Sequence, residues 1–182
     1  MLIAFIGRAG SGKDYQCKKL VDQGFTKIAF ADCLREISAK VLGMSIDYLY
    51  DNYDSLKITK LFNELTLRNI LENLGSALRD IDEDFFVNQA LKQIKHKNSN
   101  YCISDARYLN ELKALFKFSQ DNQIDFKCYF CDYKSDRYQE INEHESAKLS
   151  NFLCKKGFKD LQEISISDIN MIERELCSGY SD

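Results

Sequence analysis

The stretch Leu2-Ile-Ala-Phe-Ile6, followed directly by Gly7-Arg8-Ala9-Gly10-Ser11-Gly12-Lys13-Asp14, decides the fold. The first five residues are all apolar, which is typical of a strand buried on both faces of a parallel sheet. The glycine-rich turn that follows leads into a predicted helix over residues 13–22. The start of the chain therefore predicts a strand, a tight loop and a helix, in that order.

The loop fits the pattern G-x-x-x-x-G-K, which is typical of loops that bind phosphate groups. Glycines let such a loop wrap so that several backbone N–H groups point at one phosphate, and the start of the next helix adds positive potential. Lys13 is expected to reach the terminal phosphates and to balance their charge. We therefore expect the loop to bind ATP through Arg8, Ala9, Gly10, Ser11, Gly12, Lys13 and Asp14.

Asp14 stands where such loops usually have Ser or Thr, whose hydroxyl normally ligates Mg²⁺. A carboxylate can ligate the ion directly or through water, since hard oxygen ligands suit Mg²⁺. The simpler interpretation is that Asp14 only stabilises the start of the helix. Asp14 and Asp105 are the predicted metal ligands.

Strands and helices alternate along the rest of the chain. Further strands are predicted at residues 25–30, 101–104, 124–131 and 164–166, with helices between them. One of these helices is expected to be capped by Asp32 and another by Thr66, and a further helix is expected over residues 82–94. This alternation predicts an α/β fold with a five-stranded parallel sheet flanked by helices. Ligands bind at the carboxyl ends of the strands in such sheets, so the chemistry is expected just after residues 6, 30, 104 and 131.

The composition excludes several classes of protein. The 182 residues are 45% hydrophobic and 29% charged, which is ordinary for a globular domain. A net charge of −3 argues against nucleic-acid binding through bulk positive charge. The longest purely apolar run is residues 1–6, and no secretory signal is recognised, so we expect a cytoplasmic protein without membrane contact.

Cysteine usage does not indicate a disulfide framework, because the seven cysteines are odd in number and scattered. The pair Cys128 and Cys131 has the spacing of a zinc motif. Residues three apart on a strand point to opposite faces, however, so buried small side chains are the preferred interpretation and a structural zinc ion the minor one.

Five segments, in order along the chain, resemble phage and bacterial deoxynucleoside monophosphate kinases. Gly12-Lys13-Asp14 is similar to the family's G-K-D-T, and residues 30–36 (F-A-D-C-L-R-E) are similar to its F-A-D-P-L-K-E. Residues 67–76 with Arg79 and 84–87, residues 104–111 (S-D-A-R-Y-L-N-E) and residues 144–146 resemble its three later motifs. The chain departs from the family at Tyr15, which replaces Thr, and at Ala147, which replaces Glu.

The resemblance implies a P-loop kinase fold in a single domain over residues 1–182. A helical substrate-binding insert is expected near residues 44–98 and a short lid near 132–150. The implied reaction is transfer of the ATP γ-phosphoryl group to a deoxynucleoside monophosphate, with Mg²⁺ required. If the chain is phage-encoded, the compartment is the host cytoplasm. The oligomeric state stays open, a homodimer included.

The resemblance also implies roles for particular side chains, because two anions must be held end to end and cations must offset both. The implied catalytic residues are Lys13, Asp105, Arg107 and Arg137. The implied acceptor-binding residues are Asp32, Arg35, Arg68, Gly75, Arg79, Arg107, Asn110 and Glu111.

Two alternatives stay open at this point. One is another small-molecule P-loop kinase, such as an enzyme like dephospho-coenzyme A kinase. The other is a nucleotide-binding sensor without turnover, which the departures at Tyr15 and Ala147 allow. The sequence does not predict which base is accepted.

Overall fold

The computed structural model describes residues 1–182 except 9, 57–58, 63, 97–98, 134–147 and 179–182. The chain forms two compact units. The first consists of residues 1–29 and 91–182, and the second of residues 30–90. The phosphate-loop pattern belongs to the first unit.

The first unit is built on a five-stranded sheet. Its strands lie in the order β2 (Thr26–Ile28), β5 (Tyr101–Ala106), β1 (Leu2–Ile6), β6 (Phe126–Cys131) and β7 (Leu161–Ile164). The central strand β1 pairs in parallel with β5 and β6, so that Ala4 lies opposite both Ile103 and Cys128. All five residues of β1 are buried, as an apolar strand in the middle of a sheet requires.

The predicted α/β fold with a five-stranded sheet flanked by helices is confirmed, but the predicted all-parallel arrangement is wrong at one edge. Strand β7 runs antiparallel to β6, with Ile164 opposite Cys128 and Leu161 opposite Cys131. The chain returns to the edge of the sheet where β6 ends and pairs from there. An antiparallel pair does not need the crossover that a parallel strand would require.

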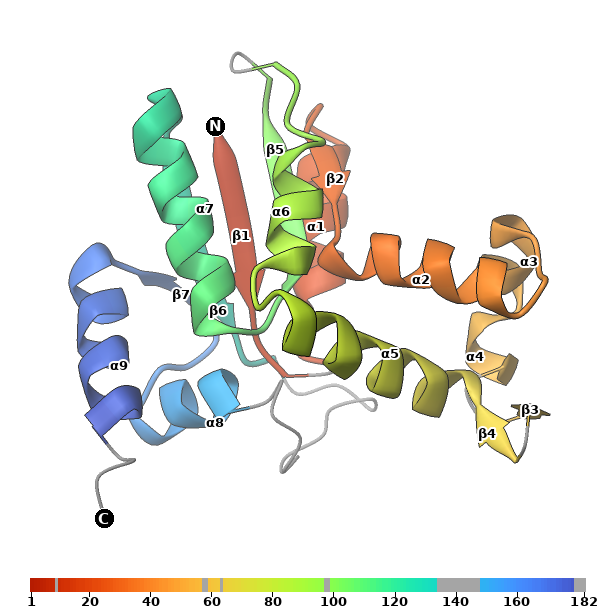
Figure 1. The fold of residues 1–182 in the computed structure, drawn as a ribbon. Coiled ribbons are helices and arrows are strands. Elements are labelled where there is room, and N and C mark those ends of the chain that lie inside the picture. The colour runs from red at the N-terminus through yellow and green to blue at the C-terminus, as the bar shows by residue number, and fades with distance from the viewer. Residues whose placement is uncertain (9, 57–58, 63, 97–98, 134–147, 179–182) are drawn as a thin grey trace. The chain divides into compact units, whose positions relative to one another are not determined.

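Helices cover both faces of this sheet (Figure 1). Helix α1 (Lys13–Val21) lies on one face, where Cys17 and Leu20 pack with Ile3 and Phe5. Helices α7 (Leu109–Asn122) and α9 (Ile166–Ser178) contact each other, and the Lys113–Glu173 ion pair joins them. Helix α8 (Lys148–Lys155) precedes β7.

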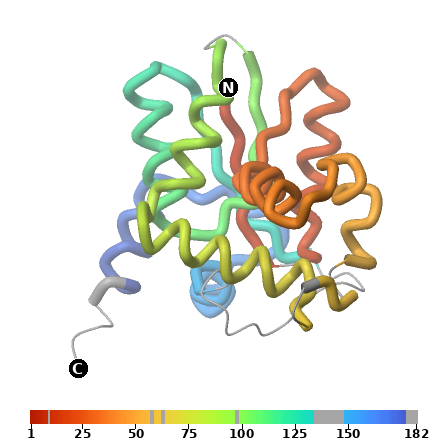
Figure 2. Tube along the Cα trace, turned by 45° about the vertical axis from the view of Figure 1, so that its right-hand side comes forward, coloured from red at the N-terminus to blue at the C-terminus, as the bar shows by residue number. Residues whose placement is uncertain are grey.

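The second unit is mainly helical. It contains α2 (Phe30–Val41), α3 (Ile46–Asp51), α4 (Tyr53–Leu56), the hairpin of β3 (Lys60–Phe62) and β4 (Leu65–Thr66), α5 (Leu67–Ile81) and α6 (Phe85–Leu91). Helix α2 packs against α5, as the orange and olive tubes of Figure 2 show. Buried side chains of four segments form its core: Ala39, Leu49, Leu56 and Leu67.

The start of α5 confirms the predicted cap at Thr66. Its hydroxyl accepts a hydrogen bond from the Asn69 N–H (3.3 Å), and the Asn69 side-chain oxygen accepts one from the Thr66 N–H (3.1 Å). This reciprocal pair satisfies two donors that the first helical turn leaves without partners.

Several predicted boundaries shift. The strand expected at residues 25–30 covers only Thr26–Ile28, and Asp32 lies in the first turn of α2 instead of before it. Strand β5 runs past residue 104 to Ala106, because Ala106 pairs with Ile6. The helix expected over residues 82–94 is α6, and the last strand lies at residues 161–164.

The expected insert at residues 44–98 overlaps most of the second unit, which begins earlier, at Phe30. Most of the expected lid, residues 134–147, lies outside the described residues. Among the helices that are described, none combines the length and the apolar character needed to cross a membrane.

Candidate functional site

The predicted phosphate loop joins β1 to α1, and two of its glycines are required by geometry. A Cβ on Gly7 would lie 2.2 Å from the Cys131 carbonyl oxygen, so the ends of β1 and β6 approach too closely for a side chain. Gly12 is the residue before α1 and has φ +87°, a conformation that L side chains rarely adopt. The glycine pattern therefore serves the shape of the loop itself.

Lys13 lies inside the loop and not on its outer surface. Its side chain is buried, and its ammonium donates hydrogen bonds to the carbonyl oxygens of Gly7 (2.8 Å) and Arg8 (2.6 Å). Burial, and next the positive charge of Arg107, lower the pKa of Lys13 from 10.5 to about 8. The loop thus holds a poorly solvated cation, which a phosphate anion would stabilise.

Ser11 supplies an independent indication that this loop receives a polar ligand. Ser11 is 1% exposed, and its hydroxyl has no hydrogen-bond partner among the described residues. Buried hydroxyl groups in folded proteins normally have a partner, because burial without one is costly. A phosphate oxygen is an acceptor for such a hydroxyl.

The rest of the loop is only partly visible. Arg8 is half-buried, Gly10 has φ +76°, and Ala9 lies outside the described residues. The fit to ATP therefore rests on the Lys13 ammonium and the buried Ser11 hydroxyl.

Asp14 has a partner that the sequence did not indicate. Its carboxylate accepts a hydrogen bond from the Lys27 ammonium of β2 (Nζ to Oδ1, 2.9 Å). Burial raises the pKa of Asp14, but the hydrogen bond and charge of Lys27 outweigh it, so the pKa lies below its ordinary value. Asp14 is therefore ionised and paired at neutral pH.

Strand β5 places Asp105 and Arg107 beside the loop, since β5 is the neighbour of β1. The positive charge of Arg107 lowers the pKa of Lys13, and the negative charge of Asp105 raises it. The structure thus brings together four predicted residues at the carboxyl ends of β1 and β5: Lys13, Asp14, Asp105 and Arg107.

Glu111 acts on the backbone that carries Arg107. Its buried carboxylate accepts hydrogen bonds from the N–H groups of Arg107 (2.8 Å) and Tyr108 (3.1 Å) at the start of α7. This gives Glu111 a positioning role that differs from the predicted contact with the acceptor. Asn110 is half-buried in the first turn of the same helix, and its acceptor-binding role stays a prediction.

In the second unit, two tyrosines surround the predicted pair Asp32 and Arg35. Arg35 donates to Asp32 Oδ1 (2.8 Å), and the Tyr50 hydroxyl donates to the same oxygen (3.0 Å). The Arg35 guanidinium also lies 5.7 Å from the Tyr50 ring centroid and 5.3 Å from that of Tyr53. Sequence reasoning missed both tyrosines; aromatic residues three apart behind the F-A-D segment are the signal that could have indicated them.

Helix α5 places Arg68, Gly75 and Arg79 on one side, because their spacings of seven and four residues bring them to the same face. Arg68 pairs with Glu72 (3.0 Å). Arg79 donates to the Gly75 carbonyl (3.3 Å), and its guanidinium lies 4.5 Å from the Phe86 ring centroid. Gly75 is buried, and a Cβ there would be in van der Waals contact with Leu34 and Arg79. Both arginines are therefore oriented by neighbours within the second unit.

The remaining predicted residues separate into two groups. Arg137, with residues 144–147, lies outside the described residues. Cys128 and Cys131 are buried, and burial raises the pKa of Cys131 to about 12 and that of Cys128 further. Cys131 packs with Cys17 beneath α1, whereas Cys128 lines a groove with residues of α7 and α9.

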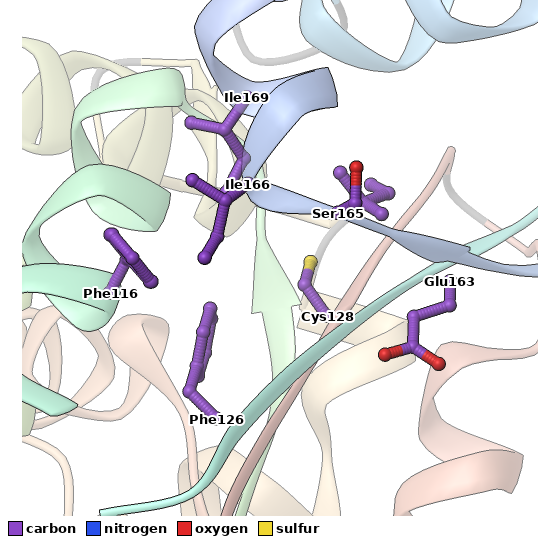
Figure 3. A pocket seen from close by; sticks show the side chains of 8 residues that line it. Phe116, Phe126, Cys128, Glu163, Ser165, Ile166 and Ile169 are labelled. Carbon is purple, nitrogen blue, oxygen red and sulfur yellow. The ribbon is translucent and has the colours of Figure 1, made fainter. Parts of the chain in front are cut away.

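This groove, of about 250 Å³, is shown in Figure 3. Its wall is mostly apolar, with Phe116, Phe126 and Ile169 labelled around the Cys128 thiol. None of the predicted site residues lines it. It lacks the cations that phosphate binding needs, so the candidate site is the loop and not the groove.

Mg²⁺ fits this site with one or two carboxylate ligands, the others being phosphate oxygens or water. The described residues contain no group of three or more His, Cys, Asp or Glu side chains placed to hold a metal. Mg²⁺ in nucleotide sites is commonly bound by one or two carboxylates, together with phosphate oxygens and water. Asp14 and Asp105 supply carboxylates for that arrangement.

Fold and loop together define an α/β protein whose central strand is followed by a G-x-x-x-x-G-K loop, the pattern typical of phosphate binding. No protein-family model matches the chain. No curated protein matches it either. Solved structures do match. One is a mutant of the Mycobacterium tuberculosis APS kinase CysC, which is 18% identical with a TM-score of 0.33, over 85% of this chain and 94% of that chain. The assignment of the class rests on the strand order and the loop of this chain.

Proposed function

We propose that this chain is a P-loop kinase that transfers the γ-phosphoryl group of ATP to a deoxynucleoside monophosphate. The observation that carries the proposal is the buried Lys13 ammonium inside the glycine loop, next to the orphaned Ser11 hydroxyl. The resemblance of the five segments to deoxynucleoside monophosphate kinases supplies the acceptor. Such transfers need positioning and charge stabilisation more than covalent chemistry, and the residues present are suited to both.

In this proposal the first unit holds the donor nucleotide. Backbone N–H groups of the loop and the Lys13 ammonium bind the phosphates, and the Ser11 hydroxyl donates to a phosphate oxygen. Arg107 offsets charge on the transferring group, with its backbone fixed by Glu111. When bound, Mg²⁺ would neutralise phosphate charge, and Asp14 and Asp105 are the residues that would hold it.

The second unit is proposed to bind the acceptor. Arg35 is held by Asp32 and flanked by Tyr50 and Tyr53, and such a fixed guanidinium suits a phosphate or a base edge. Arg68 and Arg79 share one face of α5, so both can serve one anionic ligand.

The experiment is a nucleotide-consumption assay over a panel of acceptors. With Mg-ATP, the four deoxynucleoside monophosphates, their ribonucleotide counterparts, dephospho-coenzyme A and APS are tested separately. We expect ADP formation with at least one deoxynucleoside monophosphate, and no turnover in Lys13→Met, with circular dichroism checking that this variant folds.

Other outcomes discriminate the alternatives. Turnover with dephospho-coenzyme A or APS alone would assign another small-molecule kinase. ATP binding without turnover on any acceptor would assign a nucleotide sensor. The absence of heat and of a thermal shift with Mg-ATP would refute nucleotide binding altogether.

A further inference from the structure

Lys27 is a charged residue of the site to which no pattern in the sequence points. It lies in the edge strand β2, opposite Cys102 of β5 in the sheet register. Its ammonium reaches across to the first turn of α1, where it binds Asp14 at 2.9 Å. The fold therefore brings a strand lysine to the residue that directly follows the phosphate-loop lysine.

The pairing answers an electrostatic problem that the loop creates for itself. A phosphate loop attracts anions, yet Asp14 places a carboxylate next to Lys13, where it would repel phosphates. The Lys27 ammonium offsets that charge. Burial lowers the pKa of Lys27, but the hydrogen bond and charge of Asp14, with the more distant charge of Asp105, outweigh burial and raise the pKa above its ordinary value. Lys27 therefore stays protonated beside Asp14.

The pair is not placed there for stability. The side chains of Lys27 and Asp14 are 42% and 80% exposed, and ion pairs this exposed contribute little to folding. An exposed pair also separates readily when a stronger partner arrives. The hydroxyl of Ser11 in the same loop is buried and has no hydrogen-bond partner among the described residues. It indicates independently that the ligand of this loop includes an anion such as phosphate.

We propose that Lys27 is the exchangeable counter-cation of the phosphate loop. Its ammonium neutralises Asp14 while no divalent cation is bound, and it leaves Asp14 when a divalent cation enters with the nucleotide. The nucleotide part of this inference rests on the proposed function, whereas the exchange at Asp14 does not. Lys27 is a positioning residue here, because it acts through Asp14.

If Lys27 exchanges in this way, removing its charge should raise the affinity for a divalent cation and lower the affinity for a metal-free nucleotide. In Lys27→Met, Asp14 is left uncompensated, so a divalent cation binds more tightly and a metal-free nucleotide binds more weakly. At about 4 Å a unit charge changes binding of another unit charge by about fivefold in water, and of a divalent ion by about thirtyfold before screening, which salt reduces toward about tenfold. A residue that only supports the fold would not produce opposite shifts.

The experiment uses the full chain and two probes. Mn²⁺ binding without nucleotide is measured by electron paramagnetic resonance, and ADP binding in excess chelator is measured by calorimetry. For Lys27→Met we expect Mn²⁺ affinity to rise about tenfold and ADP affinity to fall about fivefold. Lys19→Met is the matched control, since it removes the same charge from an exposed position on α1 that lies on another face than Asp14, and it should shift neither affinity more than twofold.

A double variant identifies the partner. In Lys27→Met with Asp14→Asn the carboxylate is gone as well, so both shifts should disappear. Lys27→Gln repeats the measurement if Lys27→Met does not fold, which circular dichroism checks.

Three results would overturn the inference: an unchanged Mn²⁺ affinity in Lys27→Met, shifts of both affinities in the same direction, or equal shifts in Lys19→Met. Failure of the unchanged protein to bind ADP, with or without Mg²⁺, would refute the proposed function instead. In that case the Mn²⁺ measurements alone decide the exchange at Asp14.

Discussion

Nucleotide binding should take up a proton, and the responsible group is Lys13. In the empty loop the pKa of Lys13 is about 8, because burial and then the charge of Arg107 disfavour the ammonium. Phosphate oxygens favour the ammonium, so the bound state should restore a pKa near the ordinary value of about 10.4. Raising the pH therefore removes from the empty loop a proton that the nucleotide needs.

The magnitude follows from the difference between the two pKa values. At about pH 9 roughly nine-tenths of the empty protein has a neutral Lys13, against roughly one-tenth at about pH 7. ADP affinity should therefore fall about tenfold between these two pH values, with about 0.9 proton taken up per ADP bound at about pH 9.

Calorimetry in buffers of different ionisation enthalpy measures both the ADP affinity and the number of protons taken up per ADP bound. Arg107→Gln tests the assignment of this proton to Lys13. The charge of Arg107 is the second cause of the lowered pKa of Lys13, so removing it should move the midpoint of the pH dependence of ADP affinity upward, even if it weakens binding. An ADP affinity that is flat from about pH 7 to pH 9, with no proton uptake, would show that Lys13 is fully charged in the empty loop and would refute this reasoning.

The same shift fixes the sign of a stability effect. The unfolded chain holds the Lys13 proton more tightly than the native loop does, so the free energy of unfolding should rise as the pH increases from about 8 to about 10.5. At most about 3 kcal/mol is involved, and Lys13→Met should lack this rise in denaturant titrations over the same range.

Three further predictions concern the surroundings of the loop. Arg107→Ala should lower kcat by about a hundred- to a thousandfold, with Arg107→Lys recovering only part, as steady-state kinetics with varied acceptor would show; unchanged kcat and KM would remove Arg107 from the site. Glu111→Ala leaves the N–H groups of Arg107 and Tyr108 without their acceptor, so urea titration should show a loss of about 2 kcal/mol; a loss below about 0.5 kcal/mol would contradict the anchoring role. Gly7→Ala would place a Cβ 2.2 Å from the Cys131 carbonyl oxygen, so it should lower the melting temperature and abolish ADP binding; near-normal binding would mean that the loop can shift.

Local sequence pattern predicted those features that depend on neighbours in the chain. The five apolar residues of β1 and the glycine loop after them specified a buried central strand and its turn, and Thr66 with Asn69 behind it specified the start of α5. Burial and capping involve residues that are close in sequence, so the pattern contains the information.

Features that depend on pairing between distant segments were not predictable in this way. The short apolar run near residue 164 carries no information on strand direction, so the antiparallel pairing of β7 was missed. Lys27 approaches Asp14 only because β2 and α1 flank β5. For Glu111 a signal did exist. It lies three residues after Tyr108, the spacing at which a carboxylate caps a helix start, and the resemblance drew attention to a ligand instead.

The antiparallel edge strand has a consequence for how this protein could be altered. Because β6 and β7 pair with Cys131 opposite Leu161, the segment between them leaves and re-enters the sheet at one place. The Asp132 N–H donates a hydrogen bond to the Asp160 carbonyl oxygen (3.0 Å), which joins the two ends of this segment. Doubling the length of a flexible insertion closed at such a base costs only about 0.6 kcal/mol in closure entropy. Foreign sequence, such as a reporter peptide, could therefore be inserted at the exposed Gly157, between α8 and β7, while every strand of the sheet keeps its register.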